Sequence, residues 1–249
     1  MSNYIIKETF TLPSKGMIYD SPINPEVTLR SMTTMDELKR LSPNENEFQV
    51  LANLIEDCIV GNLGMRVYDL CIGDFTFLLH KLRIVSYGAE YKMLVECPKC
   101  HSLEEQIFDL ETLETIEYKK GLEDLLKISL PMSKIDISLK FTTPRMIDTI
   151  ARKRKEYLKK NPEAIDPQFL LNIEELIDEV DGKKLSFPEL ENFVQNLPIK
   201  DANFIIQKAE EFNRAIGLDT TFINECKVCG YTYPVSFRYG LEFFRPTTY

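Results

Sequence analysis

The spacing of apolar residues in the first half of the chain predicts a strand followed by three helices. Residues 27–30 alternate between apolar and polar, as a half-buried strand does. The threonine pair at 33–34 is placed to cap a helix whose apolar residues recur at helical spacing, namely Met35, Leu38 and Leu41. A second helix is expected over about 47–60, and a third is expected to be capped by Asp74 and to end near Gly88.

The second half of the chain repeats this order. Residues 135–139 alternate as a strand, a helix is expected over about 144–160, and the run 204–208 matches 77–81. Gly217 precedes Cys226 by nine positions, as Gly88 precedes Cys97. The unit is too long for a solenoid repeat. We therefore predict an α+β fold of two internally duplicated halves, 1–118 and 119–249.

Each half ends in a pair of cysteines with the CxxC spacing. Cys97 and Cys100 lie between β-prone runs, as do Cys226 and Cys229, which predicts strand, tight turn and strand with the thiols at the tip. One CxxC turn supplies half of a tetrahedral metal site. Two such turns would supply four thiolates and close the site to water or substrate, which is typical of one structural zinc per chain. Iron or an iron–sulfur cluster is the less favoured metal, and unliganded thiols are the alternative without any metal.

Composition and charge narrow the classes of partner. The 249-residue chain has a formal net charge of −9, which argues against general binding of nucleic acid or an anionic membrane. No apolar run approaches the ~20 residues that span a bilayer. Residues 152–155, Arg-Lys-Arg-Lys, together with Lys159 and Lys160, form the main basic cluster on a predicted helix. We expect them to be solvated, with an acidic protein partner as the alternative.

Few residues suggest catalysis. The sequence contains no phosphate-binding glycine loop, GxSxG or HExxH motif. Cys58 and Cys71 lack paired spacing and are expected in the core, although a thiol nucleophile formed by Cys71 and His80 stays open as an enzyme alternative. The first ten residues lack the zones of a signal peptide, so we expect a cytosolic protein with reduced cysteines.

The C-terminal stretch 239–246 is apolar and aromatic. It is expected either to pack back on the second half or to offer a docking strip to another chain, with packing favoured.

Several short motifs, taken in order, carry a resemblance to a known family. They are the turn Leu12–Gly16, the strand end and threonine cap 29–34, the helix segment 74–81, the stretch 83–88 and the CPxC knuckle at 97–100. In this order they resemble the baseplate hub and hub-assembly proteins of T4-like contractile-tailed bacteriophages. The second half departs from the pattern, because 210–214 reads EEFNR where 83–87 reads RIVSY.

The resemblance implies a late, non-enzymatic protein that binds phage baseplate hub proteins during tail assembly. It would act in the host cytoplasm as an assembly factor, or remain in the virion tail baseplate as a minor hub component. A zinc-ribbon nucleic-acid-binding module is the alternative function, and it predicts salt-sensitive binding to DNA or RNA.

Overall fold

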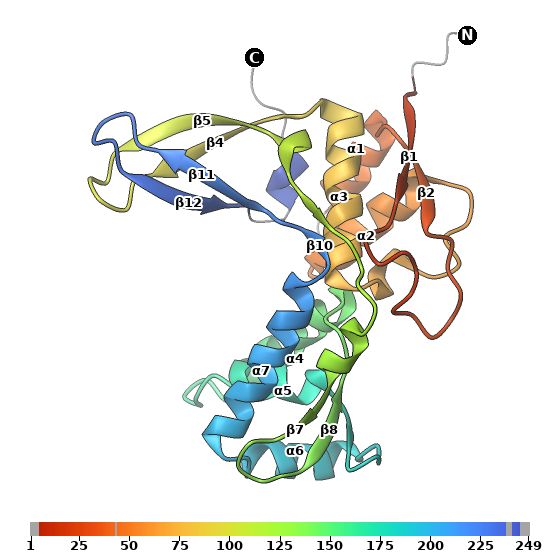
Figure 1. Cartoon of the computed structure of the whole chain (residues 1–249), viewed down its shortest axis with the longest axis vertical. Helices are drawn as coiled ribbons and strands as arrows, with labels where there is room; N and C mark the ends of the chain where they lie inside the picture. The colour runs from red at the N-terminus through yellow and green to blue at the C-terminus, as the bar shows by residue number, and fades with distance from the viewer. Residues whose placement is uncertain (1–4, 43, 238–240, 245–249) are drawn as a thin grey trace.

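A computed structural model describes residues 5–42, 44–237 and 241–244 and has an α+β architecture (Figure 1). The described residues contain seven α-helices: α1 (Thr34–Arg40), α2 (Glu47–Cys58), α3 (Ile72–Tyr87), α4 (Pro144–Lys160), α5 (Gln168–Leu176), α6 (Phe187–Gln195) and α7 (Ile199–Arg214). Short 3-10 turns occur at η1 (Val67–Asp69), η2 (Leu110–Thr112), η3 (Leu122–Leu126) and η4 (Leu241–Phe244).

The strands form small antiparallel sheets. Two sheets have three strands each: β1 (Lys7–Thr11), β2 (Glu26–Arg30) and β3 (Ile59–Val60) in one, and β7 (Lys127–Ser129), β8 (Asp136–Leu139) and β9 (Ile177–Val180) in the other. Two hairpins follow the long helices: β4 (Glu90–Glu96) with β5 (Leu103–Asp109), and β11 (Thr221–Glu225) with β12 (Thr232–Ser236). The short strands β6 (Thr115–Ile116) and β10 (Gly217–Leu218) pair with each other in an antiparallel arrangement. They lie just before and just after the segment 117–216.

Two hydrophobic cores divide the molecule into a body and a lobe. We use "body" for residues 5–116 and 217–244 and "lobe" for residues 117–216, which lie below the body in Figure 1. The lobe core is drawn from residues 130–209. The body core joins residues 12–110 with Phe237, Phe243 and Phe244 from the chain end.

Part of the aromatic C-terminal stretch therefore packs on the body, and on the first half of the chain, where packing on the second half was expected. Phe243 and Phe244 are buried, and the Phe243 ring stacks on His80 with centroids 5.9 Å apart. Residues 239, 240, 245 and 246 of the predicted stretch lie outside the described residues.

Helix starts agree with the sequence in two cases and differ in one. Thr33 caps α1 with a full capping box, and Thr143 caps α4 by accepting from the backbone N–H of Met146. Asp74 does not cap α3, because the N-cap is Cys71. Asp74 lies in the first turn of the helix and accepts a hydrogen bond from the backbone N–H of Ser14 at 2.9 Å, so its carboxylate anchors the turn at Ser14 instead.

A glycine contact sets how closely α3 approaches the lobe. A Cβ added to Gly73 would lie 2.4 Å from the backbone oxygen of Ile216, and one added to Gly217 would lie 2.8 Å from the Gly73 Cα. The two backbones can therefore touch only if both positions lack side chains. Ile72 N–H donates to the Thr142 carbonyl at 2.8 Å beside this contact.

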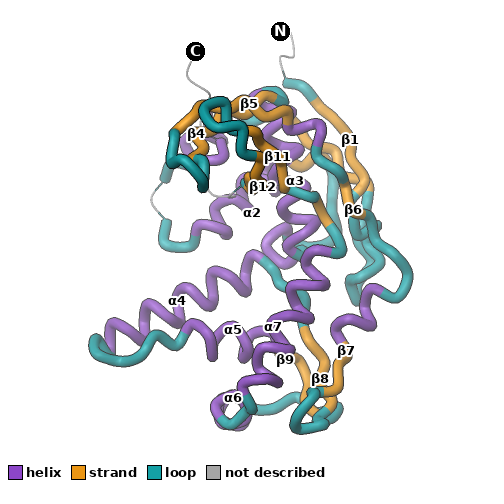
Figure 2. The backbone as a smooth tube through the Cα atoms, turned by 60° about the vertical axis from the view of Figure 1, so that its left-hand side comes forward, coloured by secondary structure: helices purple, strands orange, loops and turns teal. Residues whose placement is uncertain are grey.

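Helix α4 holds the lobe against the body from the other side (Figure 2). The Asp148 carboxylate accepts from the backbone N–H groups of Phe48 and Gln49, at 3.3 and 2.8 Å, and from the Tyr68 hydroxyl at 3.0 Å. Asn46, the N-cap of α2, makes no side-chain cap of its own, so Asp148 supplies acceptors that the start of α2 needs.

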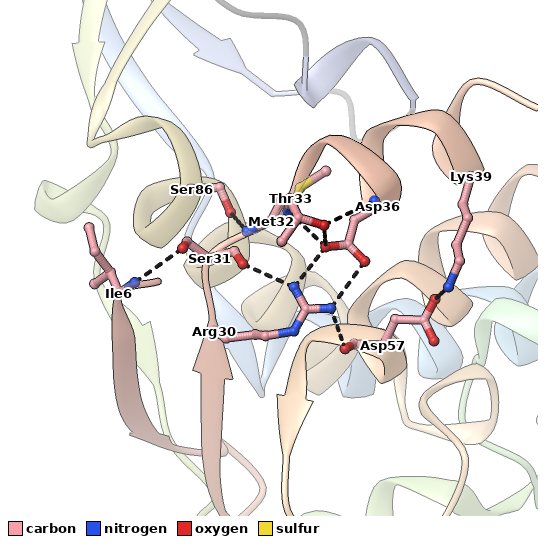
Figure 3. Close-up of polar contacts among 9 residues, drawn as sticks. All are labelled: Ile6, Arg30, Ser31, Met32, Thr33, Asp36, Lys39, Asp57 and Ser86. Atoms are coloured by element: carbon pink, nitrogen blue, oxygen red, sulfur yellow. Dashed lines mark hydrogen bonds and ion pairs between the residues drawn. The ribbon is translucent and has the colours of Figure 1, made fainter. Parts of the chain in front are cut away.

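A buried ion-pair network fixes α1 on the body (Figure 3). The guanidinium of Arg30 binds both oxygens of Asp36, at 2.7 and 3.0 Å, and donates to the Asp57 carbonyl at 2.8 Å. Asp36 also accepts from the backbone N–H and the hydroxyl of Thr33, each at 2.7 Å. The hydrogen bonds from Arg30 lower the pKa of Asp36 to about 2.

We predict that Gly73→Ala destabilises the protein by about 2 kcal/mol or more, because the new methyl group would meet backbone that cannot move aside. At an open helical position the same change would stabilise by up to ~1 kcal/mol, so the sign of the effect is diagnostic. Urea unfolding of both proteins measures the difference. A stabilised variant would mean that the α3–lobe contact is looser than described.

We also predict that the contribution of Asp36 disappears in acid. Its pKa is lower in the folded state than in the unfolded chain, so the carboxylate stabilises the fold above about pH 4 and loses this effect as the pH falls toward 2. After allowance for solvent screening, the contribution is on the order of 1 kcal/mol. The difference in unfolding free energy between wild type and Asp36→Asn should be largest at pH 7 and shrink below pH 4. A difference that stays constant with pH would contradict the ion pair.

Candidate metal centre

The two CxxC hairpins lie side by side and form an arm that projects from the body (Figure 1). Their facing sides are aromatic. The Phe108 ring on β5 lies 4.9 Å from that of Phe222 on β11, and both rings meet Phe237 beyond β12. Hairpins separated by more than a hundred residues are thus aligned along their length, with the thiols at one end.

The two knuckle turns have the same backbone geometry. In the first, Cys97 N–H donates to the Ser102 carbonyl and His101 N–H donates to the Cys97 carbonyl. In the second, Cys226 N–H donates to the Tyr231 carbonyl and Gly230 N–H donates to the Cys226 carbonyl. His101 and Gly230 hold equivalent positions with φ of 58° and 66°, a left-handed conformation that is uncommon for a histidine.

All four predicted cysteines come together at the tip of the arm. The Sγ atoms of Cys97, Cys100, Cys226 and Cys229 all lie within 4.8 Å of one another. Two contacts cross between the hairpins: Cys97 to Cys229 at 3.8 Å and Cys100 to Cys226 at 3.6 Å. These separations are far longer than a disulfide bond, and all six cysteines are free.

The donor set fits a tetrahedral metal. Zinc–sulfur bonds of about 2.3 Å place the sulfurs of a tetrahedron about 3.8 Å apart, close to the two cross-hairpin distances. Four thiolates complete the coordination of zinc and leave no position for a reacting ligand. Chemically, the arrangement is suited to holding two hairpins together.

Polar groups around the thiols come mainly from the first hairpin. The Ser102 hydroxyl lies 3.2 Å from the Cys100 sulfur and 3.3 Å from that of Cys226. Glu104 accepts from the Cys226 thiol at 3.6 Å and from the Lys227 backbone N–H at 3.3 Å. Hydrogen bonds from the side chain and backbone of Ser102 lower the pKa of the exposed Cys100 thiol to about 6. The backbone hydrogen bond at Tyr231 lowers the pKa of Cys229 in the same cluster, but desolvation and hydrogen bonds to the other three thiols outweigh it, so that the pKa of Cys229 is raised. Sequence reasoning assigned no role to Ser102 or Glu104, since only the folded arm brings them to the second knuckle.

His101 is directed elsewhere. Its Nδ1 pairs with the Glu96 carboxylate at 2.8 Å, and the cluster of potential metal ligands among the described residues does not include it.

The other cysteines and histidine are buried. Burial raises the pKa of Cys58 to about 12, and the Cys71 sulfur accepts from the backbone N–H of Asp74 at the start of α3. His80 Nε2 donates to the Leu110 carbonyl at 2.9 Å, and burial lowers its pKa to about 4. These environments favour structural roles over the nucleophile pair considered from the sequence.

Residues 152–155 of the basic cluster on α4 are neutralised within the chain. Arg152 pairs with Glu156, Lys153 with Glu175, Arg154 with Asp166 and Lys155 with Glu45. The charges of 152–155 are therefore matched locally, while Lys159 and Lys160 are exposed in the last turn of α4.

Comparison with known proteins identifies one family. A family model described as T4 bacteriophage base plate protein matches residues 3–245. No curated protein and no solved structure gives a significant match to the chain. Within the described residues, no helix is long and apolar enough to cross a membrane. The family description names the base plate without specifying the hub, so the hub assignment stays a prediction.

Proposed function

The chain belongs to the T4 bacteriophage base plate protein family, and from this premise we propose that it helps to build the base plate hub by binding other proteins, as an assembly factor or a minor hub component. The convergence of four cysteines on a projecting arm carries the proposal. With a metal bound by all four thiolates, such an arm would be a braced contact element without an open catalytic position.

We further propose that Cys97, Cys100, Cys226 and Cys229 hold one structural zinc. The cross-hairpin sulfur distances and the donation to Cys100 from Ser102 support this assignment. When bound, zinc would supply Lewis-acid bonds to all four sulfurs. The chain itself supplies the alignment, because the aromatic contacts of Phe108, Phe222 and Phe237 already place the hairpins against each other.

We infer that the halves 1–118 and 119–249 arose by duplication. A matching pair of contacts supports this inference. In each half, an aspartate in the first turn of a 16-residue helix accepts hydrogen bonds from the turn that precedes the middle strand. Asp74 binds the N–H of Ser14, and Asp201 binds those of Met132 and Ser133. Lys15 and Lys134, close behind these turns, both have positive φ.

The zinc assignment predicts a linked loss of metal and stability. Wild type should carry one zinc per chain by elemental analysis, and chelation should lower its melting temperature. Binding at a free zinc concentration a thousandfold above Kd contributes about 4 kcal/mol, which corresponds to about 10 °C for a chain of this size. Cys100→Ser and Cys226→Ser should bind less zinc, melt lower and no longer respond to the chelator.

Val228→Ser is the matched control, since Val228 lies between two of the cysteines, is 70% exposed and leaves all four thiols in place. It should keep its zinc and its melting temperature. Full zinc content and an unchanged melting temperature in Cys100→Ser would refute the site. Iron in place of zinc would support the site but correct the metal.

The assembly proposal predicts which molecules the protein binds. Affinity purification from phage-infected cells in the presence of nuclease should recover base plate hub proteins, identified by mass spectrometry. Cys226→Ser should recover less, because a loosened arm presents a less defined surface. Recovery that depends on nucleic acid and falls steeply with salt would favour the zinc-ribbon alternative instead. Recovery of base plate proteins outside the hub would limit the proposal to the family level.

A further inference from the structure

Helix α1 is oriented with its charged side inward and its apolar side outward. Met35, Leu38 and Leu41 expose 63%, 55% and 62% of their surface, whereas Asp36 and Arg40 are only 3% and 4% exposed. An amphipathic helix on a globular protein normally buries its apolar stripe. The face formed by Met35, Leu38 and Leu41, here called the α1 face, is therefore an exception that needs a cause.

The cause of the inward charge is the ion-pair network. Asp36 is bound by Arg30 and by the Thr33 cap, and Arg40 pairs with Glu37 through Nε at 2.8 Å. Lys39 at the side of the helix pairs with Asp57 at 2.6 Å (Figure 3). Rolling α1 over to bury its apolar stripe would separate Asp36 from Arg30 and Lys39 from Asp57, and the half-buried Arg30 guanidinium would lose its carboxylate partner, which is unfavourable. The α1 face is thus held toward solvent.

The first helix of the lobe uses the equivalent face as a contact. Thr33 and Thr143 are both N-caps, so Met35 and Leu38 occupy the positions that Arg145 and Asp148 occupy in α4. Arg145 binds Asp69 and lies over the Tyr68 ring, while Asp148 caps the start of α2. In α4 this face is polar where it meets the body: Asp148 is buried there, while Arg145 reaches the body with its side chain still 47% exposed. In α1 the same face is apolar and uncovered by the described residues.

The inward faces of the two helices also differ in polarity: the face of α1 is charged, whereas that of α4 is apolar. Asp36 and Arg40 correspond to Met146 and Ile150, which pack in the lobe core. Hence α1 has the polarity expected of a helix that is covered by something apolar on its outer side.

The character of the α1 face limits what could cover it. Of the exposed residues in 34–42, all of which the structure describes, Lys39 alone is charged, and Asp57 neutralises it. The matching surface should therefore be apolar and without net charge. A helix of seven residues is only about 10 Å long, so its exposed face is much smaller than the ~1,200 Å² that a stable complex buries. The α1 face therefore suits one contact within a larger assembly.

We propose that the α1 face docks against an apolar, uncharged surface of another base plate protein, a partner distinct from a second copy of this chain. This inference rests on the proposed role in base plate assembly. It adds a second contact surface, an apolar helix face, to the arm that carries the four thiols.

A photo-crosslinking amino acid at Leu38 tests the proposal in phage-infected cells. The same amino acid at Ile165, which is 91% exposed in the lobe, serves as the matched control. Position 38 should crosslink to a base plate protein identified by mass spectrometry, and position 165 should not. Crosslinks from 38 to this chain itself, or equal crosslinks from both positions, would overturn the proposal.

The protein identified by crosslinking is then purified, and its affinity for wild type and variants measures how much the α1 face contributes to binding. Leu38→Asp combined with Leu41→Asp should weaken its affinity at least tenfold, while Ile165→Asp should leave it unchanged. The substituted side chains are exposed, so all variants should keep the wild-type melting temperature and zinc content. Unchanged affinity in the double variant would refute docking through the α1 face but leave the assembly role standing. If wild type captured no base plate protein at all, the assembly role itself would fail.

Discussion

The convergence of two distant hairpins at one tip is the constraint on which the rest of the structure depends. Cys100 and Cys226 are 126 positions apart, yet their sulfurs lie 3.6 Å from each other. For this to occur, the chain must leave the body after β5, build the whole lobe and return through β10 to the same place. Closing so long a loop is entropically costly. Metal–sulfur bonds at the tip would offset this loss of chain entropy, because two isolated hairpins packed through aromatic rings are only marginally stable.

The same constraint explains the tight junction between body and lobe. If the return path were loose, the second hairpin would reach the first in many registers. The Gly73–Gly217 contact and the β6–β10 pair fix the path immediately before β11 begins. Asp148 fixes the opposite side of the junction by completing the start of α2. The lobe thereby acts as the spacer through which the chain returns to bring the second knuckle to the first.

Local signals predicted the elements well. The hairpins, the helix over 144–160 and the threonine caps follow from turn chemistry and periodicity within a few residues, and the structure has them where the sequence predicts them. The cysteine cluster was also predictable, since CxxC spacing already aims two sulfurs at one point. Ser102 and Glu104 were not, because their role depends on a neighbouring hairpin that is remote in sequence.

The errors came where a tertiary partner overrides a local preference. Asp74 has a good capping side chain, but the turn at Ser14 takes its carboxylate and Cys71 takes the cap. A different gap in the sequence prediction is the direction of the stripe Met35, Leu38 and Leu41: their helical spacing predicts the helix but not that this stripe faces outward. The decisive group is Arg30, six positions before Asp36 on a different element.

This outward orientation bears on the kind of protein described. An enzyme concentrates its unusual chemistry in a recessed site, where buried and strained groups meet a substrate. Two unusual features of this chain lie on the outside: a projecting arm with thiols at its tip and a helix whose charges are paired inward so that its apolar side faces solvent. The charged groups Arg30 and Asp36 hold α1 in the orientation that exposes its apolar side. Under the function proposed above, both features would contact other proteins, which is consistent with membership in the T4 bacteriophage base plate protein family.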